Sequence, residues 1–190
     1  MDQFRWGIIG SGYVARKFAL GLPSAENAVA AAVTSRTPAN AEAFAKRYRV
    51  GRAFRTVEEL VASSEVDAVY VATPPREHAA HALACIEAGK PVLVEKPFAL
   101  DARDARIIAE PAAMYDVFCM EGLSTRVLPP VLATRALVRS GDLGEIRSAR
   151  GSFFAPPVSE ARGLFDKASG GGALLQRGVY PVSLACFLLG

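Results

Sequence analysis

Near the amino terminus stands the sequence Phe4-Arg5-Trp6-Gly7-Ile8-Ile9-Gly10-Ser11-Gly12-Tyr13-Val14-Ala15, and this stretch decides the fold. Its first half, residues 4–9, is a short apolar run that predicts a buried strand. A glycine turn follows, and residues 13–20 are compatible with a helix. A strand, a tight glycine turn and a helix in this order indicate the opening of a βαβ unit.

The same alternation of strand and helix continues along the chain. Because each parallel strand needs a crossover helix, this alternation predicts an α/β fold with a parallel sheet covered by helices on both faces. We assign it to a first domain, residues 1–122. The predicted strands cover residues 4–9, 28–34, 67–72, 91–95 and 117–121, and the predicted helices cover residues 13–20, 39–48, 56–61, 77–88 and 101–110.

The pattern changes after residue 122. A helix over 130–139, an alternating strand over 145–154, a glycine-rich loop at 169–172 and an apolar helix over 173–189 predict a second domain, residues 123–190. The strand needs neighbours for its backbone groups, and the last helix is apolar on nearly all sides. We therefore expect this second domain to be truncated, with downstream residues or a partner chain covering it.

The glycine turn matches the G-x-G-x-x-G/A fingerprint of dinucleotide-binding domains, in the strand-to-helix context that this motif requires. Gly10 makes the tight turn, Gly12 lets the backbone approach a pyrophosphate, and Ala15 lets helix and strand pack closely. The helix amino terminus supplies N–H donors for the pyrophosphate. The alternative is a chance glycine turn. The candidate binding residues here are Gly10, Ser11, Gly12, Tyr13 and Val14.

The second strand ends in Ser35-Arg36-Thr37. NAD-binding folds usually place an acidic residue here for the ribose 2′-hydroxyl, and this chain has none. An arginine between two hydroxyl side chains suits a 2′-phosphate instead. The sequence therefore favours NADP, with NAD possible; the alternative is that Arg36 is a solvated loop residue.

Glu95-Lys96-Pro97 follows a predicted parallel strand, at the sheet edge where ligands of open α/β sheets bind. A lysine there can orient a substrate hydroxyl and lower the pKa of a neighbouring acid. The alternative is an ordinary surface lysine at a strand end.

Four motifs follow one another along the chain: Gly7-Ile8-Ile9-Gly10-Ser11-Gly12, Ala72-Thr73-Pro74-Pro75 with His78, Glu95-Lys96-Pro97, and Gly170-Gly171-Gly172-Ala173-Leu174-Leu175 with Gly178 and Tyr180. Through these motifs the whole chain resembles the glucose-fructose oxidoreductase / inositol dehydrogenase (Gfo/Idh/MocA) family. Within this family it is most similar to the dihydrodiol dehydrogenase and xylose dehydrogenase branch, through Met120-Glu121 with Arg126 and Pro129, and through residues 144–147.

The resemblance implies a Rossmann domain followed by an α/β domain with an open, mostly antiparallel sheet. It implies NADP or NAD at the glycine turn, and Thr73, Pro74, His78 and Glu95 on the cofactor side. Lys96, before a cis proline, would be catalytic, and Tyr180 would exchange a proton with the substrate oxygen during hydride transfer. The alternatives are a backbone-satisfied His78 and a Tyr180 that only fills a domain interface.

The chain departs from the family at Gln176, which stands where the family usually has an aspartate of the catalytic site. An amide can donate and accept hydrogen bonds, but it can neither carry negative charge nor act as a base. The residues are therefore compatible with two functions. The first is NADP-dependent oxidation or reduction of a carbohydrate, polyol or dihydrodiol. The second is a dinucleotide-binding sensor or regulator without turnover.

Composition narrows the partners further. The 190 residues are 51% hydrophobic and 22% charged, with a net charge of +3 and no basic run, so we expect neither nucleic acid nor a membrane as partner. No export signal is visible, and the apolar tail at 172–190 reads as too short and too polar for a membrane span. We expect a cytoplasmic protein, a homodimer or higher oligomer in its full-length form, with no bound metal: His78 and His81 lack a third ligand.

Overall fold

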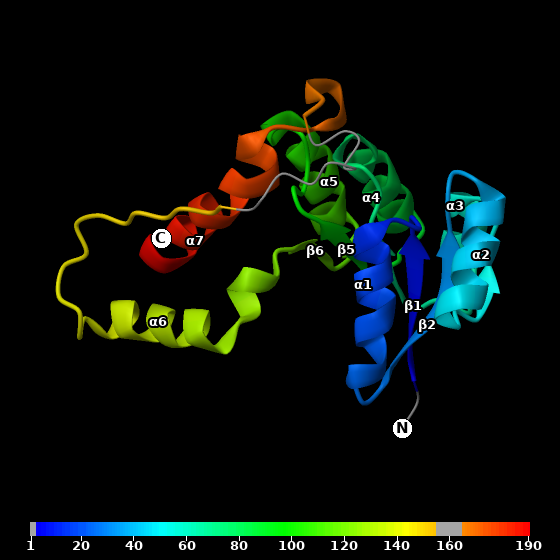
Figure 1. The fold of residues 1–190 in the computed structure, drawn as a ribbon, viewed down its shortest axis with the longest axis horizontal. Helices are drawn as coiled ribbons and strands as arrows, with labels where there is room; N and C mark the ends of the chain where they lie inside the picture. Colours follow the sequence, from blue (N-terminus) through cyan, green and yellow to red (C-terminus); the bar gives the residue numbers. More distant parts are fainter. Residues whose placement is uncertain (1–2, 155–164) are drawn as a thin grey trace. The chain divides into compact units, whose positions relative to one another are not determined.

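The computed structural model describes residues 3–154 and 165–190 (Figure 1). Strands and helices alternate through the first 122 residues, and helices dominate the rest. The strands are β1 (Phe4–Ile9), β2 (Ala28–Thr34), β3 (Arg52–Ala53), β4 (Ala68–Val71), β5 (Val92–Glu95) and β6 (Cys119–Gly122). The α-helices are α1 (Tyr13–Gly21), α2 (Pro38–Tyr48), α3 (Val57–Ala62), α4 (His78–Glu87), α5 (Ala102–Met114), α6 (Pro129–Ser140) and α7 (Val179–Leu189).

The six strands form one sheet in the order β3-β2-β1-β4-β5-β6. β1 pairs in parallel with β2 on one side and with β4 on the other, so the chain winds outward twice from the same central strand. This strand order confirms the predicted doubly wound Rossmann fold. It also creates a topological switch point at the carboxyl ends of β1 and β4, where such folds bind ligands.

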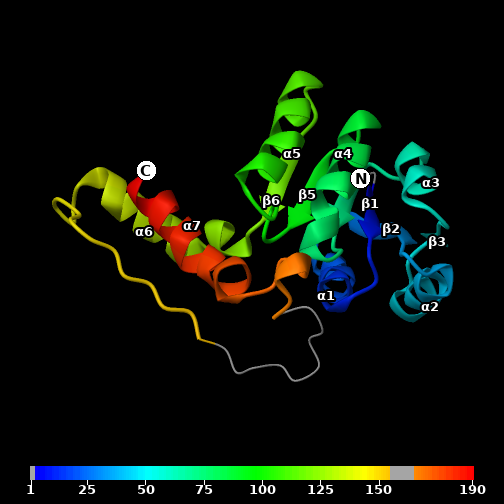
Figure 2. The same cartoon turned by 90° about the horizontal axis from the view of Figure 1, so that it is seen from above.

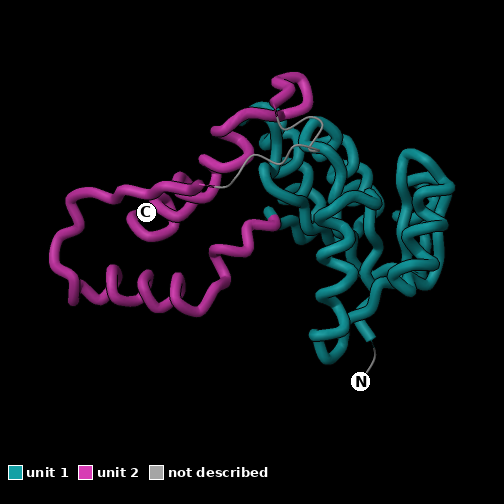
Figure 3. Tube along the Cα trace, viewed as in Figure 1, with its two compact units in different colours: residues 1–121 teal, residues 122–190 magenta. Residues whose placement is uncertain are grey.

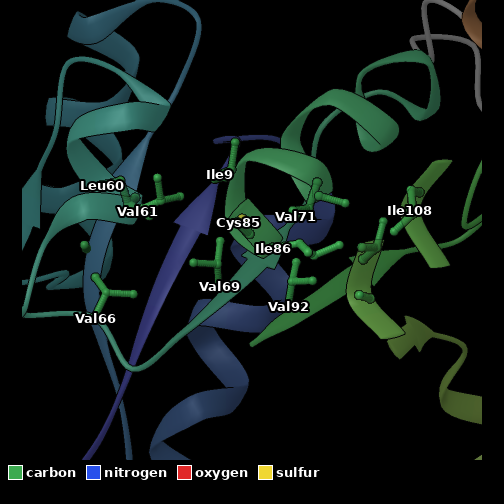
Figure 4. Packing of buried hydrophobic residues seen from close by; sticks show 14 of the residues in the cluster. Ile9, Leu60, Val61, Val66, Val69, Val71, Cys85, Ile86, Val92 and Ile108 are labelled. Atoms are coloured by element: carbon green, nitrogen blue, oxygen red, sulfur yellow. The ribbon is translucent and has the colours of Figure 1, made fainter. Parts of the chain in front are cut away.

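Helices cover both faces of the sheet. Figure 2 shows α1 and α2 on one side of the strands and α4 and α5 on the other. The buried side chains divide accordingly into two clusters. One joins the sheet to α1 and α2, and the other, drawn in Figure 4, joins it to α3, α4 and α5 through residues that include Leu60, Cys85, Ile86 and Ile108. A sheet buried on both faces explains why its strands are almost continuously apolar.

The chain divides into two compact units, residues 1–121 and residues 122–190 (Figure 3). In the second unit, α7 contacts both α6 and the 3-10 helix Ser124–Val127 that precedes it. The Arg126 Nε of the 3-10 helix donates to Ser183 Oγ at 2.8 Å, and the Arg135 guanidinium of α6 lies 4.1 Å from the centre of the Phe187 ring.

Helix α5 continues past the predicted end at residue 110. Pro111 lies inside the helix, which ends at Met114. Proline removes one backbone donor and usually ends a helix. Here the carbonyl that loses its partner belongs to Ile107, which is exposed, so water can replace the missing donor.

The predicted strand over residues 145–154 is wrong. These residues form no strand and are exposed. A strand needs a neighbour to pair its N–H and C=O groups, and the described residues of the second unit contain no strand after β6 that could pair with it. The alternating pattern therefore has no strand partner among residues 3–154 and 165–190. The open antiparallel sheet of the second domain remains a prediction.

The carboxyl-terminal helical stretch differs from the prediction in two ways. It begins as a π-helix, Leu174–Gly178, before becoming α7, and most residues of α7 are half-buried, with only Ser183 buried. The helical stretch 167–189 contains an 18-residue window with a mean hydropathy of 1.3, so it is long and apolar enough to cross a membrane by length and composition alone, contrary to the prediction for this tail. Core helices of soluble proteins meet the same criterion, so a spanning role does not follow.

Candidate nucleotide-binding site

A cavity of about 540 Å³ lies in the first unit, where β1, β2 and β4 end. Its position is the switch point of the doubly wound sheet. Ten of the predicted cofactor-binding residues line it, namely Gly10, Ser11, Gly12, Tyr13, Val14, Ser35, Arg36, Thr37, Thr73 and Pro74. The fold thus brings together three segments that are far apart in the sequence and were each predicted to bind the cofactor.

Gly10 joins β1 to the turn in a conformation that other residues rarely adopt, with φ of +111°. Its N–H donates to the Thr34 carbonyl at 2.8 Å, which links the turn to β2. A Cβ atom here would lie 2.6 Å from the Ala72 carbonyl oxygen at the end of β4. The close approach of β1 and β4 therefore requires glycine at this position.

Gly12 is the N-cap residue of α1. The space beside its Cα is open, since no atom would lie within 4 Å of an added Cβ. No side chain caps α1, so its first N–H groups are available to a ligand. Ala15 is fully buried where α1 packs on the sheet. Free donors, the positive end of the helix dipole and an approachable backbone suit a pyrophosphate.

Ser35 and Thr37 shape the turn that follows β2. The Ser35 hydroxyl oxygen lies 3.2 Å from the Thr37 carbonyl and 3.4 Å from the Thr37 N–H, so the short side chain fixes the turn locally. Arg36 stands between them, lines the cavity and forms no ion pair in the described part of the chain. An unpaired guanidinium at this place suits an anionic group on the ribose.

His78 lies behind the cavity and does not line it. Its side chain is 1% exposed, with Nδ1 2.8 Å from the Pro97 carbonyl oxygen and Nε2 2.9 Å from the Thr73 carbonyl oxygen. Burial lowers the pKa of His78, and the hydrogen bonds to Thr73 and Pro97 oppose this shift only in part. These contacts fit the alternative in which His78 bonds to backbone groups and does not contact the cofactor. His78 connects the end of β4 to the loop after β5.

His81, one turn further along α4, lines the cavity instead. Its Nδ1 lies 3.1 Å from the Thr73 hydroxyl, and burial lowers its pKa. Sequence reasoning missed this residue, together with Asn40 and Arg55, which also line the cavity. For His81, the available signal was its place in the first turn of a helix that starts at the sheet edge.

Glu95 and Lys96 lie at the end of β5, outside the residues that line the cavity. The Tyr70 hydroxyl donates to Glu95 Oε1 at 2.6 Å, and the Lys96 N–H donates to Glu95 Oε2 at 3.1 Å. Burial, and then the Glu95 charge, raise the pKa of the Tyr70 hydroxyl, so it stays protonated and donates. The Lys96–Pro97 bond is cis, as the resemblance implied.

The loop that carries Lys96 is held from several elements. Besides Glu95 and the His78 contact to Pro97, the Phe98 N–H donates to Glu121 Oε1 at 3.0 Å, which ties the loop to β6. These three side chains bond to the backbone of Lys96 and of the two residues that follow it. The loop is thus preorganised at the carboxyl edge of the sheet.

Gln176 and Tyr180 belong to the second unit. The Gln176 Nε2 donates to the Gly170 carbonyl at 2.9 Å, so its amide group serves as a donor to the glycine-rich loop. The Tyr180 ring stacks on Phe153, with 4.8 Å between ring centres. An aspartate could not make the Gln176 contact, because an ionised carboxylate only accepts hydrogen bonds.

Residues 3–154 and 165–190 contain no group of three or more His, Cys, Asp or Glu side chains that could hold a metal ion. The absence of a metal stays a prediction.

Comparison with known proteins identifies the family. The model of an oxidoreductase family with an NAD-binding Rossmann fold matches residues 4–123, and that of the GFO/IDH/MocA C-terminal domain matches residues 131–190. The chain belongs to the Gfo/Idh/MocA oxidoreductase family. The predicted family is thereby confirmed.

Among the curated Gfo/Idh/MocA relatives, the trans-1,2-dihydrobenzene-1,2-diol dehydrogenase of Mus musculus is 34% identical over 189 residues. The human protein of the same name is also 34% identical. These matches support the predicted branch. The alignment covers 98% of this chain but 56% of the mouse protein, so the chain spans about half the length of these relatives.

Solved structures of the family share the fold. The 3-ketoreductase KijD10 from Actinomadura kijaniata, in complex with NADP and TDP-benzene, is 32% identical with a TM-score of 0.88, over 100% of this chain and 58% of KijD10. GenD2 from gentamicin A biosynthesis, in complex with NAD, is 25% identical with a TM-score of 0.83, over 100% of this chain and 54% of GenD2. Because one neighbour holds NADP and the other NAD, the fold alone does not select the cofactor.

Proposed function

We propose that this chain is the nucleotide-binding part, with the beginning of the substrate domain, of an NADP-dependent dehydrogenase acting on CH–OH groups. The observation that carries the proposal is the cavity at the switch point, which joins the glycine turn to an unpaired Arg36. A small carbohydrate, polyol or dihydrodiol is the substrate class proposed, since dihydrodiol dehydrogenases are among the similar proteins. We also propose a cytoplasmic, homodimeric or larger full-length protein with no nucleic-acid or membrane partner.

The residues of the cavity fit a dinucleotide. The backbone at Gly10–Gly12 and the amino terminus of α1 suit the pyrophosphate, and Ser35, Arg36 and Thr37 suit the ribose end with a 2′-phosphate. When bound, a nicotinamide cofactor supplies a site that accepts or delivers hydride. Thr73 and Pro74 line the same cavity, where they would fix the position of the cofactor.

Lys96 and Tyr180 are the proposed catalytic residues. Lys96 would hydrogen-bond the substrate hydroxyl, with its backbone held in place by Glu95 and by the contacts on Pro97 and Phe98. Tyr180 would exchange a proton with the substrate oxygen, which is the role that the family resemblance implies for it.

One observation favours a second candidate, a dinucleotide-binding sensor or regulator without turnover. Gln176 cannot accept a proton, and its amide is engaged with Gly170. Incubation with NADP and a panel of aldoses, polyols and dihydrodiols separates the two candidates. Formation of NADPH with any of them supports the dehydrogenase, and tight NADP binding without reduction across the panel supports the sensor.

Replacing Arg36 with alanine should weaken NADPH binding by about 1.5–3 kcal/mol and leave NADH binding nearly unchanged, because only NADPH carries the phosphate that a guanidinium can pair with. Titration of the wild type and Arg36→Ala with both reduced cofactors measures the effect. Equal losses for the two cofactors would contradict the assignment of Arg36 to the 2′-phosphate.

A further inference from the structure

Arg55 stands beside the Ser35–Arg36 turn although it is remote in sequence. β2 and β3 are parallel, with Val33 paired to Ala53, and the Phe54 N–H donates to the Val33 carbonyl at 2.8 Å, which extends the pairing by one step. Arg55 follows β3 by two residues, and it lines the same cavity as Ser35 and Arg36.

The backbone at Arg55 is fixed by the start of α3. The Arg55 N–H donates to Glu59 Oε2 at 3.0 Å, and the Glu59 N–H donates to the Thr56 hydroxyl at 3.2 Å. These contacts form a capping arrangement that holds the first turn of the helix. Because the backbone is held, the exposed Arg55 side chain projects from a defined point at the rim of the cavity.

Arg55 and Arg36 are cations without an anionic partner. Within residues 3–154 and 165–190, neither side chain forms an ion pair, whereas the neighbouring Arg52 pairs with Glu65 at 3.0 Å. Glu77, the acidic residue of the cavity lining, is paired with Arg76. Two positive charges at this end of the cavity are thus left for a ligand.

We propose that Arg55 is a second determinant of cofactor specificity, whose guanidinium binds the 2′-phosphate of NADP together with Arg36. The inference rests on the proposed function. A phosphomonoester carries a charge of about −1.5 to −2 at neutral pH and offers three acceptor oxygens, so two guanidinium groups complement it better than one. The pair could not be predicted from the sequence, because it is the pairing of β2 with β3 that brings Arg55 to the cavity lined by Arg36.

The test compares Arg55→Ala with Arg52→Ala in the 190-residue chain. Arg52 is the matched control, since it lies three residues earlier on β3, is already paired with Glu65 and does not line the cavity. The probes are NADPH, NADH, 2′,5′-ADP and 5′-AMP, titrated by calorimetry. Arg55→Ala should raise the Kd for NADPH and for 2′,5′-ADP about tenfold or more, while NADH and 5′-AMP change less than about twofold. Arg52→Ala should leave all four unchanged.

Three other results are possible, and they separate failure of the inference about Arg55 from failure of the proposed function. If the wild type binds NADPH tightly and Arg55→Ala leaves the Kd unchanged, the inference is overturned and the proposed function stands. If Arg55→Ala weakens NADPH and NADH equally, Arg55 contacts the adenosine common to both, and the inference is overturned as well. If the wild type binds none of the four probes, the proposed function fails, and the inference with it.

Discussion

Gly10→Ala should destabilise the protein by about 2–6 kcal/mol and abolish cofactor binding. The added Cβ would lie 2.6 Å from the Ala72 carbonyl oxygen, and the alanine would have to adopt a φ of +111°. Either the backbone strain persists or β1 separates from β4. Both outcomes distort the turn that suits the pyrophosphate. Chemical denaturation gives the stability, and a cofactor titration below the transition gives the binding.

Two other glycines of the same segment provide controls. Gly21→Ala, at the end of α1, introduces a Cβ with no atom within 4 Å and should leave stability unchanged or slightly higher. Gly12→Ala is equally unhindered in the free protein but places a methyl group where the pyrophosphate approaches, so it should fold normally and bind cofactor weakly. A Gly10→Ala variant as stable as Gly21→Ala would show that the turn is not constrained as described.

His78→Ala should lower the free energy of unfolding by about 3–5 kcal/mol at pH 8, the second large effect. The variant loses a buried ring, and whichever carbonyl of Thr73 or Pro97 accepts the ring N–H loses its donor. His81→Ala is the matched control one turn away. His81 is only half-buried and bonds to the Thr73 hydroxyl, so its loss should cost less. Equal losses in urea unfolding would contradict the special role of His78.

The effect of His78 should also depend on pH. Burial lowers the pKa of His78 in the folded state below its ordinary value of 6.5, so the unfolded chain binds the proton more readily. The stability that neutral His78 contributes is therefore complete above about pH 6.5 and declines as the pH falls toward the lowered pKa of the folded state. The difference between wild type and His78→Ala should narrow over that range, and a difference that widens at low pH would contradict the sign of the shift.

The order and type of the longer elements in the first unit followed from local patterns, whereas the two-residue strand β3 was missed. Apolar runs predicted five of the six strands, and the glycine turn and the end of β2 at Ser35–Arg36 predicted eight of the residues that line the cavity. The last helix and the segment 145–154 were different. Their patterns are those of buried elements, but in the described residues 145–154 form no strand, and only Ser183 of α7 is buried.

Contacts made across the sheet could not be predicted from one sequence. His78 and His81 share a helix turn, and only the geometry of α4 against the ends of β4 and β5 decides that His78 is buried and that His81 faces the cavity. Arg55 follows β3, whose pairing with β2 brings this segment to the cavity. The hydrogen bond from the Phe98 N–H to Glu121 could not be predicted either, since it depends on β6 lying beside β5.

The central claim, that the cavity of the first unit binds a nicotinamide dinucleotide with preference for the 2′-phosphate, is tested most directly by titrating the 190-residue chain with NADPH and with NADH. We predict saturable binding of one NADPH per chain, weaker binding of NADH, and displacement of NADPH by 2′,5′-ADP. Absence of binding by either cofactor up to about 1 mM, in a chain shown by circular dichroism to be folded, would contradict the claim.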